Sequence, residues 1–348
     1  MDYFWTVRNI HKPIWILTEV VEHLPKIKIL HAPSTGYAGF LGALISYHEN
    51  LPFILTEHGI YIRERKIDML TADWISFHRP SIMTDFDDYN HIKEIWVSFF
   101  EKIGKFCYSR ANPIFSLFNG ARDIQKAFGA DYSRTRSIPN GVNVIGLKEC
   151  IAQRADKTPQ TIVLIGRVVK IKDIKTFIRA IKITTATLPN VEGWVAGPLD
   201  EDPTYAEECE DMVKTMELEN NFKFLGFCNI KEVLPKSGIS TITSISEGMP
   251  LTILEGFAAG VPCVSTDVGC CKDLVLGGLN EEDLAIGNAG FMTPIANPAA
   301  LAKEYIKLLT DQELFDKCQA NALERVNRFY TQEQLLETYD EEYKKFLN

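Results

Sequence analysis

Apolar and polar positions along the second half of the chain change period several times, from short apolar runs to stretches with apolar residues three and four positions apart. The short runs end at glycine or proline, which is typical of buried strands followed by turns. This pattern predicts strands at 161–165, 192–196, 222–225, 239–245, 262–266 and 288–293, and helices at 174–185, 205–218, 251–259, 297–309, 312–329 and 332–346. Strands that alternate with helices favour a parallel sheet.

The first half has the same alternation with more aromatic residues. Residues 1–25 are helical in pattern, and we expect Trp5 and Trp15 to lie in the core. Ser34 or Thr35 is positioned to cap the helix that follows. The pattern predicts strands at 26–31, 53–56, 113–117 and 135–138, helices through 41–47 and at 121–128, and helix with a lid-like loop over 68–108.

The length and composition fit two soluble domains. A chain of 348 residues is too long for one ordinary domain. The turn at 139–142, Pro-Asn-Gly-Val, predicts a hinge, so we expect domains at 1–142 and 143–330. The formal charge of −9 excludes a broad phosphate-binding surface, and nucleic-acid binding is set aside.

The same composition argues against metal, disulfide and membrane-spanning roles. The eight cysteines form no C-x-x-C pair, and adjacent Cys270 and Cys271 are expected to be reduced thiols of a cytoplasmic protein. The acidic residues at 85–88 lack the glycine of a calcium loop. No transmembrane segment is expected, because 13–21 is too short and too polar to span a bilayer.

The central stretch of the sequence runs from Ile245 to Val268. A strand ends at Glu247-Gly248, a helix begins near Leu251, and Glu255 lies inside that helix. A βαβ unit binds ligands at the carboxyl end of its strand and the amino end of its helix. Free amides there donate to anionic or hydroxyl-rich groups. On spacing alone, Glu247 could equally be a charge that complements the helix dipole.

Basic residues follow an earlier strand of the same half. Arg167 and Lys172 come directly after 161–165 and precede a helix, where cations and amides can hold a diphosphate. Either residue alone would be an ordinary surface cation. The acidic run 200–202 resembles a metal motif of an unrelated fold, and we take that match as coincidence.

Glu247-Gly248-Met249-Pro250, Glu255 and the Ala-Ala-Gly-Val-Pro run at 258–262 closely resemble the E-x7-E region of retaining glycosyltransferases of family 4. The stretches LHAPSTGYAGFLGAL and PFILTEHGIYIRERKIDML resemble the Pel exopolysaccharide branch of that family. The resemblance implies the GT-B fold, which is α/β with two Rossmann-like doubly wound domains facing a central cleft. It also implies a crossover helix, 331–348, that returns to the first domain.

The resemblance also implies roles for individual residues. Arg167 and Lys172 would hold the donor diphosphate in place of a metal, although Asp173 stands where glycine is frequent. Glu255 would bind the ribose, while Glu247 and His58 would orient the transferred sugar. The remaining implied donor contacts are Gly248, Met249, Pro250 and Leu251, and the acceptor or sugar side would involve Ser34, Thr35, Gly36, Tyr61 and Arg63.

The resemblance therefore implies transfer of a hexose, expected to be glucose, from a UDP-sugar to a growing exopolysaccharide or related glycan, without metal or other cofactor. Its implied partners are the nucleotide sugar, the glycan acceptor and a membrane-bound exopolysaccharide synthesis complex, which would hold a cytoplasmic enzyme at the inner membrane. The first domain reads as shortened at its amino end, either because the natural protein is longer or because this is a reduced form. A second hypothesis is a non-catalytic nucleotide-binding or scaffold subunit of such a complex.

Overall fold

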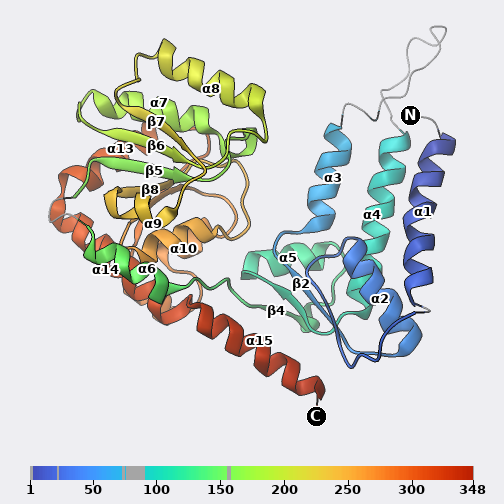
Figure 1. Cartoon of the computed structure of the whole chain (residues 1–348). Coiled ribbons are helices and arrows are strands. Elements are labelled where there is room, and N and C mark those ends of the chain that lie inside the picture. The colour runs from blue at the N-terminus through green and yellow to red at the C-terminus, as the bar shows by residue number, and fades with distance from the viewer. Residues whose placement is uncertain (1–2, 22, 73–74, 76–90, 155–157, 348) are drawn as a thin grey trace, which may run out of the picture. The chain divides into compact units, whose positions relative to one another are not determined.

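The computed structural model describes residues 3–21, 23–72, 75, 91–154 and 158–347. These residues form two compact units, one made of 1–138 with 339–348 and the other of 139–338. Each unit contains its own parallel sheet with helices packed against it (Figure 1). No helix among the described residues is both long and apolar enough to cross a bilayer.

The first unit has a four-stranded parallel sheet in the order β1-β2-β3-β4. The strands are β1 (Leu30–Ala32), β2 (Phe53–Glu57), β3 (Ile114–Ser116) and β4 (Thr135–Ser137). The helices are α1 (Tyr3–Val21), α2 (Tyr37–Glu49), α3 (Tyr61–Thr71), α4 (His91–Arg110) and α5 (Asn119–Ala127), with a 3-10 turn, η1 (Tyr132–Arg134). The core of this unit lies between the sheet and α2, α3 and α4, where Phe53, Leu55 and Ile114 are buried.

Three expectations for this unit are wrong. The strand predicted at 26–31 is only Leu30–Ala32, since Lys26 and Lys28 are exposed and lie outside the strand. Trp5 and Trp15 are 42% and 70% exposed, so they are not core residues. The amino-terminal cap of α2 is Gly36 without a side-chain bond, because the hydroxyl of Thr35 donates to Glu57 instead. The metal motif considered at 85–88 and most of the lid-like loop lie outside the described residues.

The second unit has a six-stranded parallel sheet in the order β10-β9-β8-β5-β6-β7. The strands are β5 (Thr161–Ile165), β6 (Glu192–Ala196), β7 (Phe222–Gly226), β8 (Ile239–Ile242), β9 (Cys263–Thr266) and β10 (Gly290–Thr293). The strand predicted at 239–245 ends three residues early, because the chain turns toward the loop after β5. Residues 161–165 and 192–196 are strands with the predicted bounds.

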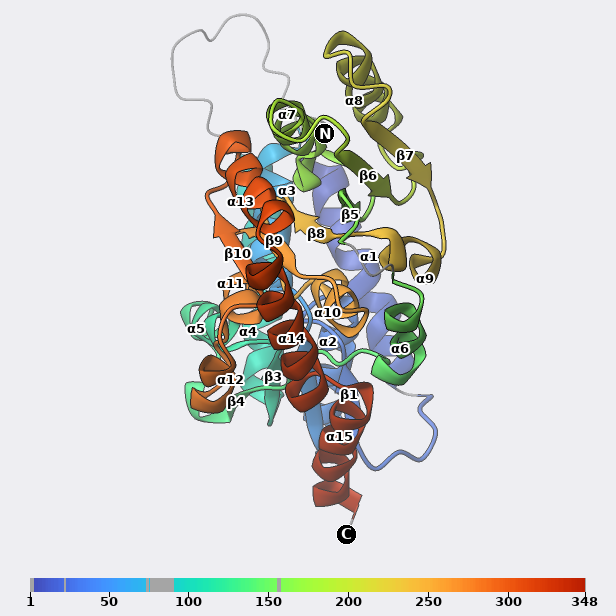
Figure 2. The same ribbon diagram turned by 90° about the vertical axis from the view of Figure 1, so that its left-hand side faces the viewer.

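Helices cover both faces of this sheet (Figures 1 and 2). One face packs against α7 (Ile174–Thr185), α8 (Pro203–Thr215) and α13 (Pro298–Thr310) through a core that includes Leu164, Phe177 and Tyr305. The other helical segments are α6 (Val144–Ala152), η2 (Lys170–Lys172), α9 (Ile230–Val233), η3 (Leu234–Lys236), α10 (Leu251–Ala258), α11 (Cys271–Leu276), α12 (Glu281–Ile286), α14 (Gln312–Phe329) and α15 (Gln332–Leu347), whose residues from Tyr339 onward belong to the first unit. Of these, α6, α9, α11 and α12 were not predicted from the sequence.

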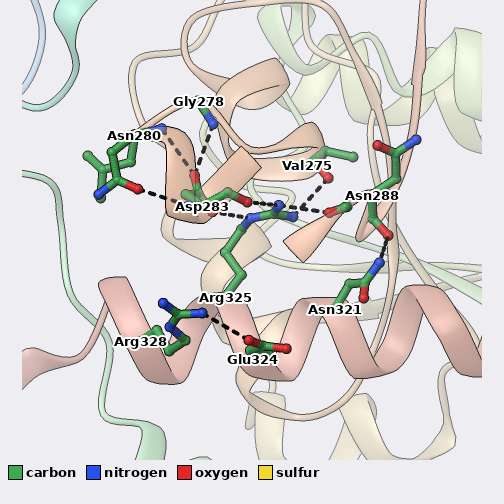
Figure 3. A network of polar contacts seen from close by, with 11 residues as sticks. Val275, Gly278, Asn280, Asp283, Asn288, Asn321, Glu324, Arg325 and Arg328 are labelled. Atoms are coloured by element: carbon green, nitrogen blue, oxygen red, sulfur yellow. Dashed lines mark hydrogen bonds and ion pairs between the residues drawn. The ribbon is translucent and has the colours of Figure 1, made fainter. Parts of the chain in front are cut away.

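A fully buried ion pair fixes α11 and α12 against α14 (Figure 3). Nε of Arg325 donates to Oδ1 of Asp283 at 2.6 Å, and both side chains are 0% exposed. The other Arg325 nitrogens donate to the carbonyl oxygens of Val275, Asp283 and Gly287. Each guanidinium nitrogen of Arg325 therefore has an acceptor, and Oδ2 of Asp283 accepts from the amides of Gly278 and Leu279, which provides the partners that burial of two charges requires.

Candidate active site

The second sheet has a topological switch point between β5 and β8. From β5 the chain continues to β6 and β7 on one side of the sheet, whereas β8, β9 and β10 lie on the other side. Ligands of open α/β sheets bind beyond the carboxyl ends of the strands at such a point. The residues that follow β5 and β8 include Arg167, Lys172 and Glu247, so the fold itself places these candidates at the expected position.

Lys172 and Glu247 form an ion pair at this switch point. Nζ of Lys172 lies 2.5 Å from Oε1 of Glu247, and the two side chains are only 21% and 12% exposed. The hydroxyl of Ser244 donates to the same oxygen at 2.6 Å. Ser244 was not among the predicted residues, because the sequence placed it inside the strand predicted at 239–245. Glu247 is thus held by two partners before any ligand is considered.

The backbone brings the two loops into this arrangement. The hydroxyl of Thr243 donates to the carbonyl of Lys172 at 2.7 Å, and the amide of Ile245 donates to the carbonyl of Ile171 at 2.9 Å. These bonds continue the contact of β5 with β8 past the ends of the strands. Lys172 and Glu247 meet because of this contact, although 75 residues separate them.

A third segment supports the Glu247 loop from the other side. The amide of Cys270 donates to the carbonyl of Gly248 at 3.0 Å. Gly269 has φ +55, and a Cβ there would lie 2.4 Å from the carbonyl oxygens of Glu247 and Gly248, so only glycine fits. Cys271 and Cys270 are buried free thiols, and burial raises the pKa of both, which keeps them protonated and inert.

Glu255 lies in the second turn of α10 and is half-buried. Its carboxylate has no hydrogen-bond or ion-pair partner within the described part of the chain. Burial raises its pKa above the usual value. A partly desolvated carboxylate without a partner is suited to accept hydrogen bonds from ligand hydroxyl groups.

The other predicted donor contacts have mixed surroundings. Met249 is buried, and the amide of Asn140 lies 3.3 Å from its sulfur, while Asn140 Nδ2 lies 3.4 Å from its carbonyl oxygen. Pro250 precedes α10 without a side-chain cap, and Leu251 is 44% exposed at its first residue. The amide of Ile253 donates to the carbonyl of Pro250 at 3.3 Å, whereas the amides of Leu251 and Thr252 precede the first intrahelical bond and are available to a ligand.

Arg167 lies on the loop after β5 but is not joined to the Lys172–Glu247 pair. Its Nη1 donates to Oε2 of Glu201 at 2.7 Å, and both side chains are exposed. Glu201 belongs to the acidic run at 200–202, and Asp202 of that run caps α8 by accepting from the amide of Tyr205. Within the described ranges no group of three or more His, Cys, Asp or Glu side chains is arranged to hold a metal ion.

The predicted residues of the first unit lie on two neighbouring loops. Ser34, Thr35 and Gly36 precede α2, whereas His58 and Tyr61 lie between β2 and the first turn of α3. Gly36 faces the ring of Tyr61, where a Cβ would lie 3.0 Å from the ring carbon Cζ. Both loops are therefore on the carboxyl side of the first sheet. His58 is exposed, and Arg63 is exposed on α3.

A buried carboxylate, Glu57, joins these two loops and was missed as a functional candidate. It accepts hydrogen bonds from Thr35 Oγ1 at 2.9 Å, Tyr108 OH at 2.7 Å and Gln125 Nε2 at 3.0 Å. Burial raises its pKa, and the three donors oppose that shift. Glu57 immediately precedes His58, so its hydrogen bond with Thr35 joins the loop of His58 to the loop of Thr35. Glu57 is therefore a positioning residue.

Comparison with known proteins identifies two matching family models. Residues 149–325 match the model described as glycosyl transferases group 1, and residues 1–133 match a domain of unknown function, DUF3492. The chain is similar to N-acetyl-alpha-D-glucosaminyl L-malate synthase of Bacillus anthracis, with 29% identity over 130 residues, 37% of this chain and 32% of that protein. The chain spans 20% and 57% of the lengths of two further curated relatives.

Solved structures show the same fold at low sequence identity. Alr3699/HepE of Anabaena in complex with UDP has a TM-score of 0.74 and 17% identity, covering 94% of this chain and 82% of that one. HepE was also solved with UDP and glucose and with UDP-glucose. Sucrose-phosphate synthase of Thermosynechococcus elongatus has a TM-score of 0.70 and 18% identity, covering 96% and 79%. The expected GT-B class, with two parallel-sheet α/β domains, is confirmed.

Proposed function

Because the chain belongs to the glycosyl transferases group 1 family, we propose that it is a glycosyltransferase that uses a UDP-sugar. The proposed reaction moves a hexose, expected to be glucose, to a growing exopolysaccharide or related glycan. Retention of the anomeric configuration, independence from metal and a place in the Pel-like branch of family 4 are parts of the same proposal. The UDP and UDP-glucose complexes of HepE support the choice of donor.

The observation that carries the proposal is the Lys172–Glu247 pair at the switch point of the second sheet, followed in the chain by the half-buried Glu255 of α10. A diphosphate leaving group gains negative charge as the glycosidic bond breaks. Lys172 retains further N–H donors while it is paired with Glu247, so it can also donate to a phosphate oxygen. Placing a fixed cation where charge develops stabilises the transition state.

The remaining roles follow from position and chemistry. Glu255 would accept from the ribose hydroxyls, and the amides that begin α10 would donate to the sugar or phosphate. Glu247 would orient the transferred sugar through its free oxygen, Oε2, since both of its hydrogen bonds are to Oε1. His58 would act on the transferred sugar from the first unit. Ser34, Thr35, Gly36, Tyr61 and Arg63 are proposed for the acceptor side.

Isothermal titration with UDP and UDP-glucose tests the donor site directly. We expect binding that survives a chelator and weakens about 10-fold or more in Glu255→Ala and in Arg167→Ala, because each removes a charged group that is proposed to hydrogen-bond to the nucleotide. Glu210→Ala and Arg179→Ala are the matched controls, since both residues are exposed on helices of the same unit. Absence of UDP binding by folded protein would remove the donor site from the proposal.

A second measurement separates catalysis from binding. Release of UDP from UDP-glucose, with and without glycan acceptors, reports transfer or donor hydrolysis. Binding without any turnover across acceptors would favour the non-catalytic subunit hypothesis. Binding that requires a divalent cation would contradict the metal-independent mechanism while leaving the donor class intact.

A further inference from the structure

Arg167 forms an ion pair with Glu201, a carboxylate that has no role in the proposed reaction. Its guanidinium donates to Glu201 at 2.7 Å, and the two side chains are 55% and 44% exposed. The two residues come from separate loops, one after β5 and one after β6. Glu201 therefore occupies Nη1 of Arg167, a donor that could otherwise bind an anion.

The backbone holds these two loops together. The amide of Gly166 donates to the carbonyl of Ala196 at 3.0 Å, and the amide of Val168 donates to the carbonyl of Pro198 at 2.9 Å. A Cβ on Gly197 would lie only 2.0 Å from the carbonyl oxygen of Gly166, so this close approach requires glycine. Glu201 is thus presented to Arg167 by a fixed framework, which reduces the entropy lost when the ion pair forms.

We propose that Glu201 competes with the donor diphosphate for Arg167 and thereby sets the affinity of the enzyme for its nucleotide. The inference rests on the proposed function, because it takes Arg167 as a diphosphate ligand. When the diphosphate binds, the guanidinium leaves the carboxylate of Glu201 for phosphate oxygens. When UDP departs, the same carboxylate takes the guanidinium back, so product release does not leave Arg167 unpaired.

A comparison with Lys172 explains why Arg167, rather than Lys172, would exchange its carboxylate partner for the diphosphate. The Lys172–Glu247 pair is only 21% and 12% exposed, and Ser244 holds the same carboxylate oxygen. Breaking it would leave a partly desolvated charge without a partner. The Arg167–Glu201 pair is exposed on both sides, so Glu201 regains water when it is released. The cost of that exchange is therefore small, and it tunes affinity without blocking the site.

Glu201→Gln tests the proposal, with Asp200→Asn as its control. Asp200 is exposed, has no ion-pair partner in the described residues and is adjacent in sequence, so its substitution removes the same charge without removing the pair. An exposed ion pair contributes about 0.2–1 kcal/mol, so we expect the UDP dissociation constant of Glu201→Gln to fall by about 1.5- to 5-fold. The change in Asp200→Asn should be smaller.

The double variant Arg167→Ala/Glu201→Gln provides a second test of the competition. In an Arg167→Ala background, Glu201→Gln should leave UDP affinity unchanged, because the competitor has lost its target. Equal effects of Glu201→Gln and Asp200→Asn, weaker UDP binding in Glu201→Gln, or a gain that persists without Arg167 would each overturn the proposal. If the folded wild-type protein binds no UDP, both the donor site and the role of Glu201 are disproved. If it binds UDP with an affinity that does not change in Glu201→Gln, only the role of Glu201 is disproved.

Discussion

Lys172 Nζ and Glu247 Oε1 lie 2.5 Å apart across the junction of β5 and β8. Parallel pairing aligns Ile162 with Ile239, so the two strands end at the same edge and deliver their following loops to one place. The two residues proposed for the leaving phosphate and the transferred sugar are therefore a single structural unit. A substitution of either one removes the ion-pair partner of the other.

Glu247→Gln should separate sugar orientation from nucleotide binding. The variant removes the negative charge that neutralises Lys172, so affinity for UDP should remain or rise. The rate of transfer should fall by about 100-fold, because the amide no longer orients the sugar as the carboxylate did. Titration with UDP and a transfer assay measure the two effects, and Glu210→Gln is the control. A loss of UDP affinity comparable to the loss of rate would contradict the assigned role.

His58→Ala should lower transfer without weakening UDP binding. The proposed nucleotide contacts, Lys172, Arg167 and Glu255, all belong to the second unit, whereas His58 belongs to the first. We expect about a 10- to 100-fold loss of turnover if His58 helps to orient the sugar. His48→Ala, at an exposed histidine of the same unit, should leave both quantities unchanged. An equal fall in UDP affinity and turnover would place His58 in nucleotide binding instead.

Asp173 is predicted to tolerate glycine but not alanine. It has φ +46 and its side chain accepts from the amide of Thr176, so it combines a left-handed backbone with the cap of α7. Asp173→Gly loses the cap but relaxes the backbone, and should change the free energy of unfolding by less than about 0.5 kcal/mol. Asp173→Ala loses the cap and retains the Cβ in the left-handed backbone, at a cost of about 0.5–2 kcal/mol.

Urea unfolding with a constant m-value measures both Asp173 variants. The left-handed conformation also explains why the resemblance places glycine at this position. Similar stability of the alanine and glycine variants would show that the backbone conformation has no energetic role.

The second unit was predicted more accurately than the first because its strands are longer and their ends carry glycine. The bounds of 161–165, 174–185 and 192–196 are those found. In the first unit, three strands have three residues and Trp15 is exposed, so apolar content alone was misleading. The spacing of apolar residues indicates burial only where one face of a helix or strand packs against the rest of the unit. Most side chains of α1 do not pack in this way.

The residues of the candidate site were also predicted only in part. Strand ends predicted Lys172 and Glu247, because parallel strands bring their carboxyl ends to one edge. Their ion pair depends on the neighbouring register of β5 and β8, and the Arg167–Glu201 pair depends on a contact at Gly197. Sequence spacing contains neither relationship. The buried hydrogen bonds of Glu57 were hidden for the same reason, since its partners lie up to 68 residues away.

Arg325→Leu should strongly destabilise the second unit. The variant leaves the fully buried carboxylate of Asp283 without its partner, which costs about 3–5 kcal/mol. Arg328→Leu is the control, because that exposed residue of the same helix pairs with Glu282 and Glu324, and its loss should cost less than about 1 kcal/mol. Chemical denaturation measures both. Equal losses would mean that burial of the Asp283–Arg325 pair has no special energetic weight.

The hydrogen bonds of His31 should make the first unit less stable in acid. Nδ1 of His31 lies 2.6 Å from the hydroxyl of Tyr343, and Nε2 lies 2.8 Å from Oγ1 of Thr56. Burial, and to a smaller degree the charge of nearby His58, lower the pKa of His31 below its ordinary 6.5. A histidine with a lowered pKa in the folded state binds fewer protons there than in the unfolded chain. Its stabilising contribution is therefore complete above pH 6.5 and is lost as the pH falls through the folded pKa.

His31→Phe provides the measurement. At pH 7.5 the variant should be less stable than the wild type by about 1–3 kcal/mol, because two hydrogen bonds are lost and Thr56 and Tyr343 lose a partner. Between pH 6.5 and 5 the difference should shrink, since the wild type alone loses the contribution of neutral His31. His48→Phe, at an exposed histidine of the same unit, should show no such convergence. A stability difference that stays constant with pH would mean that His31 does not titrate in this range and that its role is packing alone.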